Sequence, residues 1–416
     1  MKVLFVHQNF PGQFKHLAPA LLRAGHDVRA MAIGGAGLPQ VPMVRYAVAR
    51  GSTRDIHPLA ADFETKLIRA DACAAAALRL KREGYTPDVI FANPGWGENL
   101  YLKDVWPEAK LLALLEFFYA ARGLDVNFDA EFANTDIGNA ARVRTKNANL
   151  LLTLDSMDWG VSPTQFQHGT MPRAYRDRIS VIFDGIDTEV VRPNAAATVN
   201  VNGKTLHAGE EVLTFVNRNL EPYRGYHQFM RALPRILRER PNAEVLIVGG
   251  DDVSYGAKAP EGRTWKQIFL DEVQADLDPA RVHFLGRIPY DAYLNVLRVS
   301  RCHVYLTYPF VLSWSLIESM AAGCCIIASD TAPVVEAVRD GVWIDLPGGA
   351  AAADAGCRRG RLKGVQPRHL GHRQLHRRRR QEPAERPAVA QPERGRGGVP
   401  GGGGPLRARR LLPLGW

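Results

Sequence analysis

The chain has 416 residues, of which 46% are hydrophobic and 23% charged, a composition typical of a globular protein with room for two ordinary domains. No run of about 18 apolar residues is present, which excludes a membrane-spanning helix, and the apolar stretch after Lys2 is shorter than a secretory signal requires. The five cysteines include no C-x-x-C pair, which argues against a zinc site or a disulfide framework. We therefore expect a cytoplasmic protein, with any membrane contact peripheral and at the inner face.

The net positive charge of the chain comes entirely from its last segment. Residues 341–416 contain 16 Lys and Arg against 5 Asp and Glu, whereas the preceding residues contain 37 against 38. This tail has no Phe, Tyr or Met and includes four consecutive arginines from Arg377 to Arg380. It therefore cannot bury enough apolar surface to offset the conformational entropy that folding would cost. We expect a disordered tail. A frame slip in a GC-rich gene and an arginine-rich arm for nucleic acid or anionic lipid are the alternatives. Because the body is neutral, we expect no specific nucleic-acid partner.

Residues 1–340 alternate short apolar runs with longer amphipathic stretches, the pattern of parallel α/β units. In the first half, strands are expected in KVLFVHQ, DVRAMAI, PDVIFAN, KLLALLEFFY and WGVSP. The expected helices are Phe14–Ala24, Asp62–Glu83, Glu98–Val105 and Asp136–Asp155. These elements predict a first domain over residues 1–178.

The pattern restarts after ISVIFDGID and predicts a second domain over residues 179–340. Its expected strands are EVLTFVNR, AEVLIVGG, RVHFLGR, HVYLTY and CIIASD, and TVNVNGKTLHAGEE is expected to form a hairpin with an Asn202-Gly203 turn. The expected helices are Tyr226–Arg240, Trp265–Ala275, Tyr290–Val299, Ser313–Ala322 and Pro333–Arg339. Two doubly wound domains face across a cleft in this prediction, and ligands bind such sheets beyond the carboxyl ends of their strands.

Candidate functional residues in the first half follow expected strands. Gly12 and Gln13 come after the first strand, where a glycine lets the backbone approach a ligand and the next helix offers free N–H groups to an anion. Gly95 and Trp96 suit a substrate platform after the third strand. The alternative for Gly12 and Gln13 is an ordinary tight turn, and the alternative for Trp96 is packing beneath its loop.

Glu116 places a carboxylate at the end of the fourth expected strand, where it would point into the cleft. A solvated or capping glutamate is the alternative. Basic residues also gather on the following expected helix, at Arg142, Arg144 and Lys146, and these we interpret as a solvated face.

Two arginines follow the first strand of the second half. Arg218, next to Asn217, and Arg224 would hold a diphosphate by bidentate hydrogen bonds and stabilise its charge as it leaves. Position at a strand end favours this interpretation over two unrelated surface arginines.

The segment Thr307–Asp330 carries the most specific pattern. Ser313 and Ser315 stand at the start of a short helix whose N-terminus suits an anion. Glu318 follows one turn later, where its carboxylate would accept hydrogen bonds from ribose hydroxyls. No G-x-G-x-x-G follows the first strand of either half, which argues against a dinucleotide cofactor.

Taken together, residues 1–340 resemble glycosyltransferase family four, which has the GT-B architecture of two Rossmann-like domains. VLFVHQNFPGQFKHLAPALLRAGHDV is similar to the family's first βαβ unit, FVNRNLEPYRG to its diphosphate clamp, and FVLSWSLIESMAAGCCIIASD to its E-x7-E donor segment. The resemblance implies a retaining transferase that takes a nucleotide-diphosphate sugar and requires no metal or other cofactor. The acceptor stays open between a glycan, a lipid-linked glycan and a small metabolite.

The resemblance also implies roles for single residues. Arg218 and Arg224 would stabilise the leaving diphosphate, and Glu116 would face the reacting carbon. Gly95 and Trp96 would lie on the acceptor side. The residues expected at the donor are Gly12, Gln13, Asn217, Phe310, Ser313, Ser315 and Glu318.

The sequence departs from the family pattern at several positions. Phe310 stands where the family has its first Glu, Glu116 stands about where many members have a histidine, and Arg224 replaces a lysine. After Gly341 no segment of the sequence resembles the family pattern. Two alternative functions stay open. A nucleotide-sugar epimerase uses a similar cleft on the same fold, and Phe310 in place of a polar contact suits a non-catalytic nucleotide-sugar or glycan binder.

Overall fold

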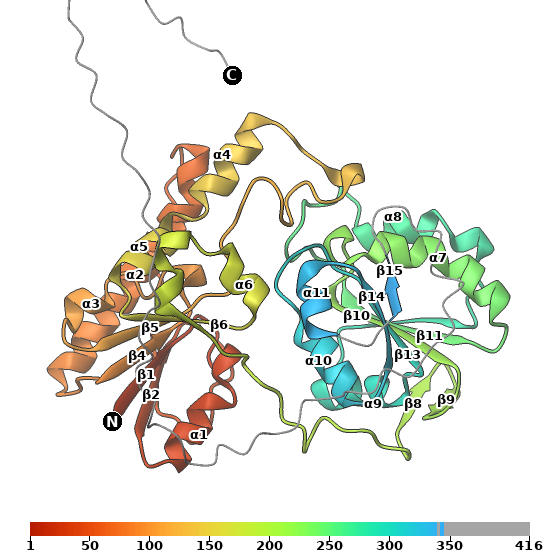
Figure 1. The fold of residues 1–416 in the computed structure, drawn as a ribbon, viewed down its shortest axis with the longest axis horizontal. Helices are drawn as coiled ribbons and strands as arrows, with labels where there is room; N and C mark the ends of the chain where they lie inside the picture. The colour runs from red at the N-terminus through yellow and green to blue at the C-terminus, as the bar shows by residue number, and fades with distance from the viewer. Residues whose placement is uncertain (339–341, 345–416) are drawn as a thin grey trace, which may run out of the picture. The chain divides into compact units, whose positions relative to one another are not determined.

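The computed structural model describes residues 1–338 and 342–344, and the expectations for the charged tail from residue 345 onward lie outside these residues (Figure 1). Two parallel β-sheets, one in each half of the chain, form the centre of the described structure. Both belong to one compact unit. The alternating α/β pattern predicted from the apolar runs is confirmed.

The first sheet has seven strands in the order β3-β2-β1-β4-β5-β6-β7. The strands are β1 Lys2–Val6, β2 Asp27–Ala32, β3 Met43–Arg45, β4 Val89–Ala92, β5 Lys110–Leu114, β6 Trp159–Ser162 and β7 Ile179–Val181. Because β7 pairs in parallel with β6, the first sheet extends beyond the domain boundary expected at residue 178.

The second sheet has six strands in the order β12-β11-β10-β13-β14-β15. The strands are β10 Val212–Asn219, β11 Glu244–Gly250, β12 Val282–Gly286, β13 Cys302–Tyr305, β14 Cys325–Ser329 and β15 Val342–Ile344. Since β15 pairs with β14 through Ile327 and Val342, the sheet continues past Gly341. The expectation that regular structure ends at Gly341 is therefore wrong.

A separate antiparallel hairpin, formed by β8 Thr198–Val201 and β9 Lys204–His207, precedes the second sheet in the chain and packs on the core of the second domain through Val201 and Leu206. Asn202 and Gly203 both have positive φ, 49° and 79°, as a two-residue type I′ turn requires. The predicted hairpin is confirmed.

Strand side chains are buried on both faces of each sheet, which explains the continuous apolar runs in the sequence. In β1, Leu4 and Val6 belong to a core shared with the helix α2 (Pro58–Arg82), whereas Val3 and Phe5 belong to a core with Phe14 on the other face. In β10, Phe215 stacks on Phe229 of the helix α7 (Tyr226–Glu239), with 4.5 Å between the ring centroids.

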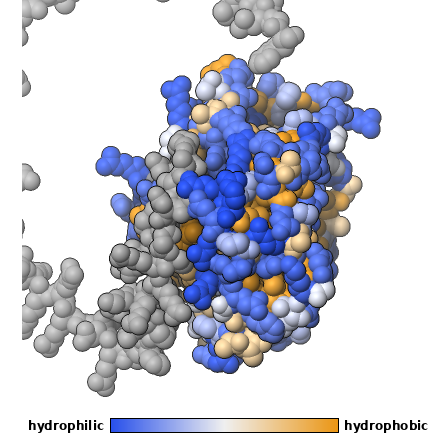
Figure 2. Space-filling view, turned by 90° about the vertical axis from the view of Figure 1, so that its right-hand side faces the viewer, coloured by the Kyte–Doolittle hydropathy of each residue, from blue (hydrophilic) through white to orange (hydrophobic). Residues whose placement is uncertain are grey.

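Helices flank the sheets near the positions that the amphipathic stretches predict, except for α6 (Gln165–Thr170), where no helix was predicted. They are α1 Leu17–Arg23, α2 Pro58–Arg82, α3 Leu102–Val105, α4 Ile137–Thr145, α5 Ala148–Ser156, α6 Gln165–Thr170, α7 Tyr226–Glu239, α8 Trp265–Asp271, α9 Tyr290–Val299, α10 Trp314–Ala321 and α11 Ala332–Ala337. Among the described helices, none is long and apolar enough to cross a bilayer. Figure 2 shows a face of the molecule that is mainly hydrophilic, with hydrophobic residues interspersed.

Two helices differ from the expectation for physical reasons. The predicted helix Asp136–Asp155 is broken into α4 and α5 at Asn147, because the Asn147 side-chain amide pairs with both backbone groups of Tyr119 at 2.8–2.9 Å. The predicted helix Glu98–Val105 begins only at Leu102, because residues 98–101 form turns that follow the left-handed Gly97.

Candidate functional site

The carboxyl ends of β1, β4 and β5 bring together polar residues from three loops. Strand order reverses between β1 and β4 in the first sheet and between β10 and β13 in the second. At such switch points the following loops diverge to opposite faces and leave a crevice for a ligand. His7, Asn93 and Glu116 follow these three strands of the first sheet. Gln13 bonds to both His7 and Glu116, and Asn93 bonds to Glu116 directly.

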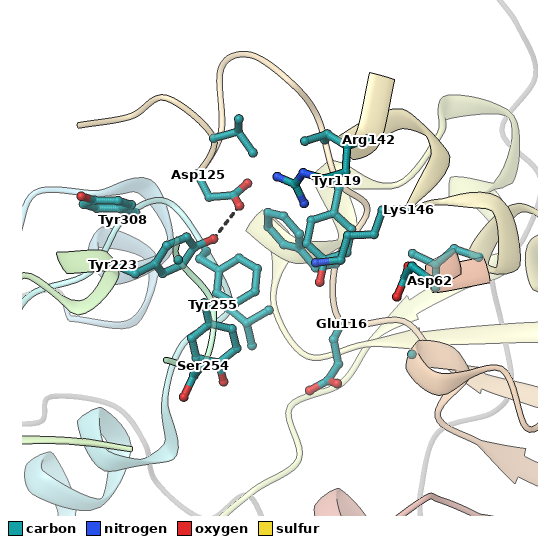
Figure 3. A pocket seen from close by; sticks show the side chains of 18 of the residues that line it. Asp62, Glu116, Tyr119, Asp125, Arg142, Lys146, Tyr223, Ser254, Tyr255 and Tyr308 are labelled. Carbon is teal, nitrogen blue, oxygen red and sulfur yellow. Dashed lines mark hydrogen bonds between the residues drawn. The ribbon is translucent and has the colours of Figure 1, made fainter. Parts of the chain in front are cut away.

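A cavity of about 840 Å³ lies at these strand ends and is lined by residues of both domains (Figure 3). Of the site residues expected from the sequence, six line it: Gln13, Gly95, Trp96, Glu116, Arg218 and Phe310. Six others are not among the lining residues: Gly12, Asn217, Arg224, Ser313, Ser315 and Glu318.

Both carboxylate oxygens of Glu116 are held by amide donors. Gln13 Nε2 donates to Oε1 at 2.8 Å, and Asn93 Nδ2 donates to Oε2 at 3.0 Å. Burial raises the pKa of Glu116, whereas the hydrogen bonds from Asn93 and Gln13 and the charge of Arg218 oppose that rise. The carboxylate therefore has a fixed orientation at the cavity wall, which a merely solvated glutamate would lack.

Gly12 occupies a position that excludes any side chain. Its φ is +47°, and a Cβ atom there would lie 2.4 Å from the ring of His7. On another side of the same ring lies Trp96, with the two ring centroids 4.9 Å apart. Trp96 is half-buried, so it both packs within its loop and lines the cavity.

The two arginines of the expected diphosphate clamp are in different environments. Arg218, near the end of β10, is exposed and lines the cavity. Arg224 is buried, and its Nη1 donates to Thr307 Oγ1 at 2.8 Å and to the Val311 carbonyl at 3.2 Å. Arg224 therefore anchors the segment that leads into α10, while Arg218 faces the cavity.

The start of α10 has the arrangement that the sequence pattern predicts. Ser313 caps the helix by accepting the Ser315 N–H at 3.3 Å, and the Ser315 hydroxyl donates to Ser313 Oγ at 2.9 Å. One turn later the buried carboxylate of Glu318 accepts the hydroxyls of Tyr290 and Tyr293, each at 2.7 Å.

Phe310 is part of an aromatic cluster between the two domains. Only 4% exposed, it packs against Phe117 at 4.6 Å and Tyr223 at 5.2 Å between ring centroids. It contributes an apolar surface to the cavity wall. No polar contact to a ligand is available from this position.

Basic residues at another part of the cavity were not predicted. Lys66 and Arg69 of α2 and Arg142 and Lys146 near α4 line it. Lys146 Nζ lies 3.9 Å from the ring centroid of Tyr119, and burial together with the neighbouring Lys66 charge lowers the pKa of Lys146. The interpretation of this cluster as a solvated face is wrong for Lys146, which is half-buried. Because α2 and α4 are distant in sequence, no local pattern signals that their cations meet.

Residues 120–136, here called the arm, connect β5 to α4 and contact the second domain. Asp125 accepts a hydrogen bond from the Tyr223 hydroxyl at 2.5 Å (Figure 3). Asp129 accepts bonds from His227 Nε2 at 2.9 Å and the Tyr308 hydroxyl at 3.0 Å. For residues 120–135 the sequence patterns predicted neither a helix nor a strand.

Asp129, Glu131 and His227 offer possible metal-ligand atoms within 4.8 Å of one another. Each of them already has a protein partner: Asp129 and His227 bond to one another, and Glu131 pairs with Arg231. We therefore interpret this group as a polar contact of the arm and assign no metal to it.

Two family models match successive parts of the chain. The model described as "Glycosyl transferase family 4 group" matches residues 24–191, and that described as "Glycosyl transferases group 1" matches residues 200–354. The second match extends past residue 340, where the resemblance was expected to end.

Individual proteins with similar sequences or folds agree with these matches. The D-inositol 3-phosphate glycosyltransferase of Nocardia farcinica is 33% identical over 186 residues, which cover 44% of this chain and 39% of that protein. The matched region thus spans less than half of that relative. The sucrose-phosphate synthase of Thermosynechococcus elongatus has a TM-score of 0.59 at 18% identity, covering 83% of this chain and 86% of its own. The starch synthase IV catalytic domain of Arabidopsis thaliana has a TM-score of 0.52 at 15% identity, covering 82% and 84%. The fold is GT-B.

Proposed function

The chain belongs to the family 4 and group 1 glycosyltransferases, and we propose that it moves a sugar from a nucleotide-diphosphate sugar to an acceptor hydroxyl, with retention at the anomeric carbon and without a metal ion. The observation that carries this proposal is the cavity at the strand ends, lined by Glu116 from the first domain and Arg218 from the second. A carboxylate and a guanidinium in one cavity suit a reaction in which a diphosphate gains negative charge while the sugar carbon becomes positive.

The donor binds mainly to the second domain in this proposal. Arg218 holds the diphosphate. The backbone N–H groups of Ser313 and Ser315 already donate to the hydroxyls of Tyr305 and Ser313, so the start of α10 attracts phosphate or sugar oxygens mainly through the helix dipole. The two tyrosine bonds to Glu318 leave acceptor capacity on its carboxylate for ribose hydroxyls.

The transfer breaks the bond between the anomeric carbon and the diphosphate oxygen. The acceptor oxygen forms its bond on the same face of that carbon, and the hydroxyl proton passes to the departing diphosphate oxygen. Glu116, fixed by Gln13 and Asn93, stabilises the positive charge of the sugar ring.

The first experiment is thermal unfolding of the full chain with UDP, GDP and ADP in the presence of EDTA. We expect one nucleotide to raise Tm, and Arg218→Ala to remove most of that shift. Arg238→Ala, at an exposed arginine of α7, is the matched control and keeps the shift. Sugar donors of the stabilising nucleotide then test transfer by nucleotide release, and NMR reads the anomeric configuration of the product. An inverted product, or no nucleotide effect, contradicts the proposal.

We further propose that the acceptor is a small polyol carrying phosphate. The cations Lys66, Arg69, Arg142 and Lys146 line the cavity. Burial and the neighbouring Lys66 charge lower the pKa of Lys146, as expected where positive charges lie close together. The matched relative from Nocardia farcinica is named for such an acceptor, D-inositol 3-phosphate.

This acceptor class is tested by comparing D-inositol 3-phosphate with inositol at equal concentration. We expect stabilisation of the chain by the phosphorylated compound only, and its loss in Lys146→Gln. Lys110→Gln, at an exposed lysine that pairs with Asp158, is the control and retains the effect. Equal stabilisation by both compounds, or by neither, refutes a phosphate-bearing acceptor of this kind.

One observation favours a second candidate function, a non-catalytic nucleotide-sugar binder. Phe310 lines the cavity without a polar group in a position where the family has a glutamate. Nucleotide stabilisation without nucleotide release from any sugar donor and acceptor pair would support the binder.

A further inference from the structure

His7 lies behind the cavity and is not among its lining residues. The side chain is buried, with 3% of its surface exposed, and it contacts residues of two loops that form the site, the one after β1 and the one after β4. Its ring lies against Gly12 and Trp96, and its Nε2 atom lies 2.8 Å from Gln13 Oε1. A change at His7 is therefore transmitted to the cavity only through these neighbours.

The hydrogen bonds of His7 fix its tautomer. The backbone N–H of Asn9 donates to Nδ1 at 3.0 Å, which requires a lone pair on that atom. The proton of the neutral ring is therefore on Nε2, where it donates to Gln13 Oε1.

The tautomer in turn sets the Gln13 amide. With Oε1 facing His7, the Gln13 NH2 group faces Glu116 Oε1 at 2.8 Å. If the amide were reversed, its oxygen would face the carboxylate and its NH2 group would face the Nε2–H of His7. Both contacts would then be repulsive, so the histidine excludes that orientation.

We propose that His7 is a positioning residue for sugar transfer, acting through the Gln13 amide to hold the carboxylate of Glu116 toward the reacting sugar. The inference rests on the proposed function of Glu116. Burial lowers the pKa of His7, which keeps the ring neutral at neutral pH. Its described ring neighbours Phe14 and Trp96 do not titrate, and the carboxylate of Glu116 is reached through Gln13.

Two variants separate this role from a merely structural one. His7→Gln keeps an N–H donor near the Nε2 position, whereas His7→Asn keeps a polar group only near the Nδ1 position. With nucleotide release from the stabilising sugar donor as the assay, we expect His7→Asn to lower kcat about tenfold with KM for the donor within about twofold. His7→Gln is expected to recover most of the rate.

The control is His303→Asn, at a buried histidine of the second domain that bonds to Thr214. It is expected to change stability without selectively lowering kcat. A double-mutant cycle adds a sharper test, because His7→Asn should cause no further loss of kcat once Gln13 is replaced by alanine. Equal rates in the two His7 variants, or additive losses in the cycle, would overturn the proposal.

The tautomer is measured independently of activity by ¹⁵N NMR of histidine-labelled full chain. We expect the ring of His7 to be in the Nε2–H form at neutral pH. A ring protonated on Nδ1, or a mixture of both forms, contradicts this inference alone. A chain with the expected tautomer that releases no nucleotide from any donor refutes the proposed function instead, and the role of His7 in transfer with it.

Discussion

The carboxylate of Glu131 forms a bidentate pair with the guanidinium of Arg231, at 2.6 and 2.7 Å, and so ties the arm to α7. These side chains are 40% and 34% exposed, respectively, so solvent screens the pair. Two residues earlier, Asp129 makes a buried polar contact by accepting hydrogen bonds from His227 and from the Tyr308 hydroxyl. The arm is thus held by one exposed and one buried polar contact.

We expect the buried contact to contribute more to stability. Asp129→Ala leaves two buried donors without their acceptor and should lower the free energy of unfolding by roughly 2 kcal/mol. Glu131→Ala removes a screened pair and should lower it by less than about 1 kcal/mol. Urea denaturation of both variants at pH 7.5 measures the difference, and equal losses would show that burial does not decide the strength of these contacts.

Much of the fold follows from local patterns in the sequence. The run KVLFV is apolar throughout because β1 is covered on both faces, and Asn202-Gly203 supplies the positive φ values of its turn. Breaks that depend on tertiary contacts were not predictable. The division between α4 and α5 at Asn147 depends on the backbone of Tyr119, which lies 28 residues earlier.

The candidate site likewise contains residues that could be predicted from the sequence and residues that could not. Glu116 and Arg218 were identified because polar residues at strand ends stand out against apolar runs. Lys66 was not, because a lysine inside a long helix carries no signal of its own. His7 also follows a strand, but nothing in the sequence indicates that it bonds to Gln13. Their places depend on which segments the sheet brings together.

Gly12 and Gly25 provide a matched pair for testing the first loop. Both have positive φ, +47° and +83°, but a Cβ atom at Gly25 would meet no other atom within 4 Å, whereas one at Gly12 would lie 2.4 Å from His7. We expect Gly25→Ala to cost about 1 kcal/mol from backbone strain alone, and Gly12→Ala to cost clearly more. Thermal unfolding compares the two variants. A Gly12→Ala variant no less stable than Gly25→Ala would mean that the His7 ring does not occupy this space.

His303 should make the fold sensitive to acid. Burial lowers its pKa from 6.5 to about 4. Between these values the unfolded chain binds a proton that the folded chain does not, so stability falls as pH drops below 6.5, by about 3 kcal/mol over the whole window. We expect His303→Asn to lose less stability than the wild-type chain between pH 7 and pH 5, as measured by urea denaturation. Parallel losses in the two chains would exclude His303 as the source.

Glu98 should have the opposite pH dependence. The side chain is fully buried, neither carboxylate oxygen has a hydrogen-bond partner among the described residues, and burial raises its pKa from 4.5 to about 7. Below 4.5 the carboxyl is neutral in both states. As pH rises to 7 the unfolded chain releases its proton first, so stability is lost, by about 3 kcal/mol in total. Glu98→Gln stays neutral at every pH, and we expect it to be more stable than the wild-type chain at pH 8, with the difference shrinking toward pH 5. Glu108→Gln, at an exposed glutamate, is the control and should show no such trend. A stability difference for Glu98→Gln that is independent of pH would mean that Glu98 titrates normally in the folded chain.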